Sequence, residues 1–81
     1  MARVSDAEIA RVIRTQATER APRTLCPSEV ARALAVDWRP LMPRVRAVAA
    51  TLPEIVATQK GDPVDPVAAK GPIRLARTAG P

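Results

Sequence analysis

The chain has 81 residues, a formal net charge of +5 and 47% hydrophobic residues, with one Trp, one Cys and no His, Phe or Tyr. This length allows a single small domain, residues 1–81, with a core of aliphatic side chains. The lone Cys26 excludes an intramolecular disulfide, and without His or further Cys we expect no metal site and no cofactor.

The positive charge is unevenly spread along the chain. Residues 1–37 hold six arginines and five acidic residues, whereas residues 38–81 hold seven cations and three acidic residues. A basic second half favours a polyanionic partner. Eleven of the thirteen cations are Arg, a bias that suits phosphate and guanine contacts but that a GC-rich genome also produces without any function.

No segment of the sequence predicts export or membrane insertion. The first residues lead straight into a helix start, without the apolar run that a signal peptide needs. No stretch approaches the roughly 20 apolar residues of a membrane span. We therefore expect a protein of the bacterial cytoplasm with no membrane partner.

Two helices are predicted in the first half of the chain, over residues 5–20 and 27–35. Ser5 and Glu8 have the spacing of a capping box, in which the two side chains satisfy each other's backbone N–H groups. Pro27 suits the first position of the second helix because its fixed φ is helical and its missing N–H is not needed there. The link between the helices is expected to pair with the later strands as a minimal third strand.

A third helix is predicted over residues 40–52. Its apolar residues cover an arc of about 120° at 100° per residue, and they are Leu41, Met42, Val45, Val48, Ala49 and Leu52. Pro40 at the first helical position would place Pro43 at the fourth, at the cost of one hydrogen bond. We expect regular helix from Pro40 to Leu52, after an irregular turn at Trp38–Arg39.

Two strands are predicted after the third helix, over residues 55–59 and 72–77, and they are expected to form a β-hairpin. The residues between them, 60–71, are rich in turn formers and too many for a tight turn; we call them the wing segment. Ile73 and Leu75 should face the helices, whereas alternation leaves open which side of the first strand is buried. The expected fold is mainly α with a small β-hairpin, a winged helix-turn-helix with three helices and a wing.

Four blocks of the chain, CPSEVARAL, DWRPLMPRVRAVA, TQKGDPVDP and KGPIRL, closely resemble a small bacterial domain family of unknown function. The block DWRPLMP, residues 37–43, is the most specific. The resemblance implies a winged-helix fold and supplies no activity. This chain departs from the family at residues 51–55, where a Gly-containing turn is usual and a shorter segment without Gly stands. Either the helix ends early at Leu52, or the strand starts abruptly after Pro53.

Helix three carries the first candidate contacts to nucleic acid. Arg39 and Arg46 are seven residues apart, so they lie on one side of the helix. In a helix-turn-helix this side enters the major groove, where Arg pairs with guanine or phosphate. The alternative is a solvated basic face. Arg44, at the other margin, is expected to contact phosphate or to form an intramolecular ion pair.

The wing and the start of helix two carry the remaining candidates, which are Lys60, Lys70, Arg74 and Ser28. Cations on a wing contact flanking phosphates, which position a protein without reading sequence. Asp62 and Asp65 oppose such contacts unless they cap the turn locally. Ser28 and Thr24 could donate to phosphate at the helix start, although Ser28 there more often completes local capping.

Trp38 is expected to wedge between helices two and three, with its indole N–H on a backbone carbonyl, because one aromatic is a poor platform for single strands. Cys26 is expected to be a small buried side chain rather than a redox-sensing thiol. An enzyme is not expected, since the sequence has no His, no Gly-rich phosphate loop and no nucleophile–base pair.

The sequence favours a winged helix that binds double-stranded DNA with low sequence preference, through helix three and the wing. The alternative is a protein-interaction or dimerisation module, because Ala47 and Ala50 leave part of helix three smooth. A small subunit that supports an enzyme stays open as a third role. Composition does not separate these three.

Overall fold

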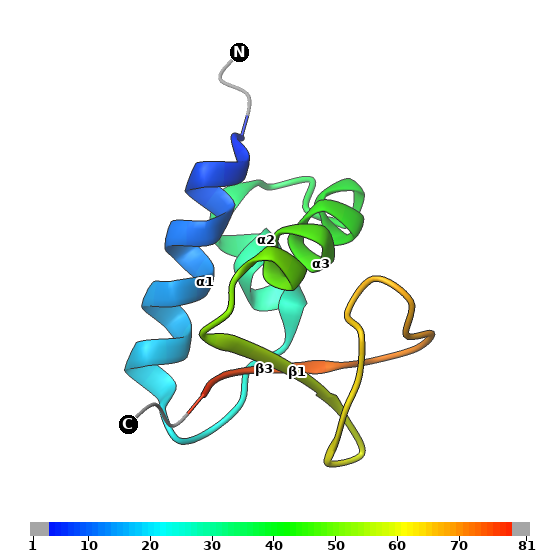
Figure 1. The fold of residues 1–81 in the computed structure, drawn as a ribbon. Helices are drawn as coiled ribbons and strands as arrows, with labels where there is room; N and C mark the ends of the chain where they lie inside the picture. Colours follow the sequence, from blue (N-terminus) through cyan, green and yellow to red (C-terminus); the bar gives the residue numbers. More distant parts are fainter. Residues whose placement is uncertain (1–3, 79–81) are drawn as a thin grey trace.

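The computed structural model describes residues 4–78 (Figure 1). Its elements in chain order are α1 (Asp6–Arg20), α2 (Pro27–Leu34), the 3₁₀ turn η1 (Arg39–Leu41), α3 (Met42–Thr51), β1 (Ile55–Gln59), β2 (Asp62–Pro63) and β3 (Arg74–Arg77). The fold is mainly helical with a small antiparallel sheet, and it is compatible with the winged helix expected from the sequence. No helix within the described residues is long and apolar enough to cross a membrane.

The start of α1 forms the capping box that the sequence predicts. The Ser5 hydroxyl accepts from the Glu8 N–H at 3.1 Å, and the Glu8 carboxylate accepts from the Ser5 N–H at 3.2 Å. Both otherwise orphan donors of the first turn are thereby satisfied. Three residues of α1 are fully buried at helical spacing, and they are Ile9, Ile13 and Ala17.

The start of α2 is anchored to α1 through Glu29. Its carboxylate accepts from the backbone N–H of Cys26 at 2.9 Å and forms an ion pair with Arg20 of α1. The Cys26 N–H first, and then the Arg20 guanidinium, hold the pKa of Glu29 below its usual value. Helix α2 begins at Pro27, as predicted, and ends one residue before the predicted end, at Leu34.

The start of the third helix differs from the prediction, because regular helix begins at Met42 and not at Pro40. The preceding residues form η1, in which the Leu41 N–H donates to the Trp38 carbonyl at 2.9 Å. A proline inside an α-helix lacks the N–H for the bond to residue i−4 and its ring crowds that carbonyl. The tighter 3₁₀ turn leaves Pro43 in the first turn of α3, where no N–H is required.

The connection between α3 and β1 is short and is closed by backbone hydrogen bonds. Helix α3 ends at Thr51, and the Leu52 N–H donates back to Ala49 at 3.2 Å. The Ile55 N–H then donates to the Leu52 carbonyl at 3.0 Å. Two outcomes were expected for this Gly-free segment, an early helix end or an abrupt strand start after Pro53. The structure has the early helix end.

The sheet has the strand order β2-β1-β3, with antiparallel pairing on both sides of β1. Strand β3 starts at Arg74, two residues later than predicted, since Pro72 has no N–H to give to a ladder. Leu25 exchanges two backbone hydrogen bonds of 2.8 Å with Leu75. The link between α1 and α2 is thus the minimal extra strand that the sequence predicts.

The wing segment contains a strand that the sequence did not predict. Residues Asp62–Pro63 form β2, and a two-residue turn at Lys60 and Gly61 joins it to β1. Both turn residues have positive φ, 53° and 87°, as a type I′ hairpin turn requires. As expected, no single tight turn joins β1 to β3, but the first residues of the wing segment form a tight hairpin with β1 that the sequence did not predict. The sequence did not indicate this strand because it contains Pro63, and proline is tolerated only at a sheet edge.

The core lies where the three helices meet one face of the sheet. Its buried hydrophobic residues are Ile9, Ile13, Ala17, Leu25, Val30, Ala31, Val45, Val48, Ala49, Leu52, Ala57, Ile73 and Leu75. The burial of Ile73 and Leu75 confirms that they face the helices. On β1, Ala57 is 5% exposed and Ile55 packs against the core, which decides the side that alternation left open.

We expect Ile13→Ala to lower the free energy of unfolding by about 2–5 kcal/mol, because it leaves a cavity in a fully buried position. Urea unfolding followed by circular dichroism measures this loss. Val36→Ala is the matched control, since Val36 is 102% exposed and its truncation should change stability by less than about 0.5 kcal/mol. Equal losses in the two variants would contradict the placement of the core.

Candidate nucleic-acid interface

The outer face of α3 is small and apolar. Pro43, Ala47 and Ala50 are exposed on it. All three polar side chains of the helix are bonded to the protein itself; they are Arg44, Arg46 and Thr51. The helix that would enter a groove therefore presents a smooth surface, whereas base readout uses side-chain donors and acceptors aimed at base edges.

Arg46 lies between α3 and the wing segment, half-buried. Its guanidinium donates to the carbonyls of Ala69 at 2.8 Å and Gly71 at 2.7 Å, with a longer contact of 3.5 Å to Pro66. These carbonyls belong to a part of the wing segment with no ladder bonds of its own. Arg46, predicted to reach into a groove, therefore holds the wing segment against α3.

Arg44 forms an ion pair across two helices. Its guanidinium donates to the Asp6 carboxylate at 2.7 Å and to the Val4 carbonyl at 2.8 Å. Of the two roles expected for Arg44, the structure has the intramolecular one. The pair joins the start of α3 to the start of α1.

Arg74 and Ser28 also have partners within the chain. The Arg74 guanidinium donates to the Thr24 hydroxyl at 2.9 Å and to the Thr24 carbonyl at 3.2 Å. The Ser28 hydroxyl donates to Cys26 Sγ at 3.0 Å, which corresponds to the local capping alternative. Cys26 is half-buried. Arg74 thus binds the link between α1 and α2 to the sheet, and Ser28 bonds locally at the start of α2.

The two lysines of the wing segment are exposed. Neither Lys60 nor Lys70 forms an ion pair within residues 4–78. The Asp65 carboxylate accepts from the backbone N–H groups of Val67 at 2.8 Å and Ala68 at 3.4 Å, so it caps the turn locally as an Asx residue. The Gln59 amide donates to the Lys70 carbonyl at 2.6 Å and fixes the backbone from which that lysine projects.

Trp38 is half-buried, and two arginines lie over its ring. The guanidinium carbons of Arg32 and Arg39 are 4.6 and 4.7 Å from the centroid of its ring. The ring packs against the edge of the core, as expected, but within residues 4–78 its indole N–H forms no hydrogen bond, so that part of the expectation was wrong. A cation over an indole face is held by the ring quadrupole, worth about 0.5–1 kcal/mol at an exposed site.

Arg32 is the residue that sequence reasoning missed. It stands six positions before Trp38, and no helical or strand spacing brings residues six apart together. The contact forms because the chain turns between α2 and η1 and brings the ring back over the helix end. The available signal was the presence of two arginines near the lone Trp38, one before the predicted turn and one after it.

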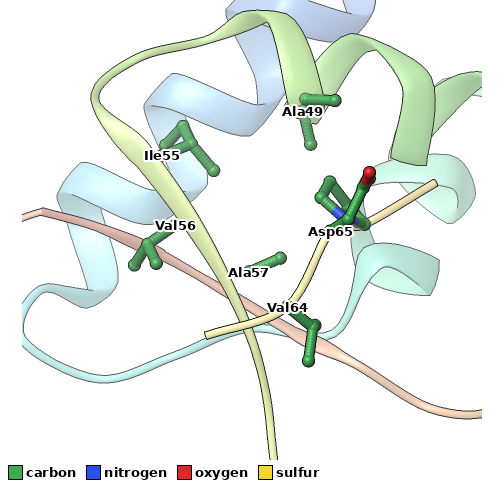
Figure 2. A pocket seen from close by; sticks show the side chains of 8 residues that line it. Ala49, Ile55, Val56, Ala57, Val64 and Asp65 are labelled. Atoms are coloured by element: carbon green, nitrogen blue, oxygen red, sulfur yellow. The ribbon is translucent and has the colours of Figure 1, made fainter. Parts of the chain in front are cut away.

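A shallow hollow of about 290 Å³ separates α3 from β1 and the wing segment (Figure 2). Ile55 and Ala57 point toward it, whereas Val56 points to the other side of the strand. Its wall is apolar apart from Asp65, so it offers few groups to orient a small ligand. Within the described part of the chain, no three Cys, Asp or Glu residues come together to hold a metal ion.

The family model described as "Protein of unknown function (DUF3253)" matches residues 5–78. The match covers nearly the whole chain, so the protein belongs to this family. Comparison with curated proteins finds no significant match.

We expect Arg46→Met to speed tryptic cleavage after Lys70 several-fold, because the wing segment loses the donor that holds its carbonyls. The loss of charged hydrogen bonds should also lower stability by about 1–3 kcal/mol. Mass spectrometry of a cleavage time course measures the rate. Arg44→Met is the control, since Arg44 is bonded to α1 and not to the wing segment. Equal rates in the two variants would mean that the segment keeps its shape without Arg46.

Proposed function

We propose that the protein binds double-stranded DNA with low sequence preference, through phosphate contacts at the start of α3 and on the wing segment. The observation that carries this proposal is the position of the cations without carboxylate partners. Within residues 4–78, the ion pairs engage Arg14, Arg20 and Arg44. Each of these pairs joins α1 to another part of the chain. Arg39, Lys60 and Lys70 form none and remain available to an external anion at this surface. Arg11, Arg23 and Arg77 also form none, but they lie on α1, in the link after it and on β3.

The arrangement of the elements supports this surface. The start of α3 and the wing segment project on the same side of the molecule, away from α1 (Figure 1). Arg46 connects the two by hydrogen bonds. In winged helix-turn-helix proteins the third helix docks into the major groove and cations beside it contact the flanking backbone.

The composition of the α3 face supports low sequence preference. Pro43, Ala47 and Ala50 carry no donor or acceptor in their side chains, so they allow close approach to a groove without reading its bases. Phosphate contacts fix register and orientation but carry no sequence information. The proposed binding is therefore electrostatic, with affinity that falls steeply with salt.

A protein partner is the second candidate, favoured by exposed apolar side chains. Val67 is 61% exposed and lines a hollow with Met42, Pro43 and Arg46. Val36 is also exposed, in the turn before η1. An exposed apolar patch beside polar residues is a feature of protein-binding surfaces, including those of dimers.

We expect a random-sequence labelled duplex to bind the protein with a log–log salt slope at least as steep as about −2.7, corresponding to the three phosphates contacted by Arg39, Lys60 and Lys70 at about −0.9 each. Fluorescence anisotropy at about 50 and 200 mM salt measures the slope. Lys60→Gln/Lys70→Gln should make the slope shallower by about 1.8, whereas Arg11→Gln, on α1, should leave it unchanged. The absence of duplex binding at the lower salt would contradict the proposed function and favour the protein partner.

A further inference from the structure

We infer that Arg32, Trp38 and Arg39 form a phosphate-binding cluster for the nucleic-acid backbone, which we call the Trp38 cluster. This inference rests on the proposed function and identifies a contact residue, Arg32, on α2. The cluster combines two cations from different elements with one ring, and the ring fixes the position of both.

The way the arginines contact Trp38 leaves their hydrogen-bond donors unused. Each guanidinium carbon lies over the indole ring, at 4.6 Å for Arg32 and 4.7 Å for Arg39. A guanidinium stacked on a ring uses its face, whereas its five N–H donors lie in its own plane and point outward from its edge. Within residues 4–78, neither guanidinium donates to a protein acceptor or lies within ion-pair distance of a carboxylate.

Three arginines on other elements differ in this respect. Arg44 and Arg46, both on α3, donate to a carboxylate or to backbone carbonyls. Arg74 donates to Thr24 in the same way. These three bind the chain to itself. The Trp38 cluster instead holds its two cations in place by cation–π contact with the ring and keeps their donors for an acceptor from outside.

The ring itself is held, so the cluster is formed before a ligand arrives. Trp38 packs against the hydrophobic core and its carbonyl accepts the Leu41 N–H of η1 at 2.9 Å. Arg32 and Arg39 are exposed around it. An arginine that is already positioned loses less side-chain entropy when it binds, which favours affinity.

The chemistry of the cluster favours a phosphate oxyanion over a nucleobase as its ligand. Since both guanidinium groups already lie over the indole ring, the ring face is not left clear for a stacked nucleobase. The planar fork of Arg matches two oxygens of a phosphate group. Because the cluster lies at the start of the third helix, beside the proposed groove-facing surface, the phosphate is that of a duplex backbone.

The first test compares duplex binding of three variants by anisotropy over a salt series. Arg32→Gln/Arg39→Gln should make the slope shallower by about 1.8 and weaken binding at least tenfold at the lower salt. Arg32→Lys/Arg39→Lys keeps both charges but loses the planar fork, so its slope should stay close to that of the natural chain while affinity falls several-fold. Arg11→Gln controls for the loss of net charge. Thermal unfolding checks that all variants are folded, as expected for exposed positions.

The second test uses Trp38 as a reporter, because it is the only Trp in the chain. Iodide should quench its fluorescence several-fold more strongly than caesium, since the two flanking guanidinium groups attract anions. Arg32→Gln/Arg39→Gln should remove this difference. Saturation with duplex should protect Trp38 from iodide in the natural chain, whereas inorganic phosphate at matched ionic strength should not.

The outcomes separate this inference from the function on which it rests. Because Arg39 already belongs to the proposed function, Arg32→Gln alone is the deciding variant: duplex binding with the natural slope in it would overturn the cluster and leave the proposed function in place. No duplex binding by the natural chain would overturn both. Protection of Trp38 by inorganic phosphate alone would overturn the assignment to a nucleic-acid backbone and indicate a site for a free phosphate.

Discussion

The hydrogen bonds from the Arg46 guanidinium to the carbonyls of Ala69 and Gly71 determine the shape of the surface described above. The wing segment has only two residues of strand, and it closes no hydrophobic core of its own. The Arg46 guanidinium therefore supplies hydrogen bonds to this segment, in place of the backbone hydrogen bonds that a longer strand ladder would give. Without it, the wing segment would be held by the Gln59 amide at Lys70 and by the packing of Val64 and Ala69, with no bond from its carbonyls to α3.

Among the arginines of this small protein, two groups have different physical roles. One group, which includes Arg44 and Arg46, satisfies carboxylates and carbonyls at the joints between elements and so contributes to folding. The other group, Arg32 and Arg39, is placed by an aromatic ring and leaves its donors unused. An 81-residue chain with a single aromatic residue has little apolar surface to bury, so charged hydrogen bonds at its joints are a useful supplement.

Local sequence signals predicted most of the fold and little of the site. The capping box of Ser5 and the helix start at Pro27 depend on neighbouring residues only, so the sequence was sufficient to predict them. The 3₁₀ turn before Met42 was not predicted, because two prolines in succession allow more than one helix start. The roles of Arg46 and Arg32 depend on contacts between elements, and no spacing in the sequence distinguishes an arginine bonded to the chain from one that is available.

The central claim is that the start of α3 and the wing segment together face a nucleic-acid backbone. The most direct measurement is a titration of the ¹⁵N-labelled protein with a short random-sequence duplex, followed by two-dimensional NMR of its backbone and indole N–H groups. We expect shifts in the Trp38 indole signal and in residues 60–71, with the signals of the α1 backbone unchanged. Shifts concentrated on α1, or none anywhere, would contradict it.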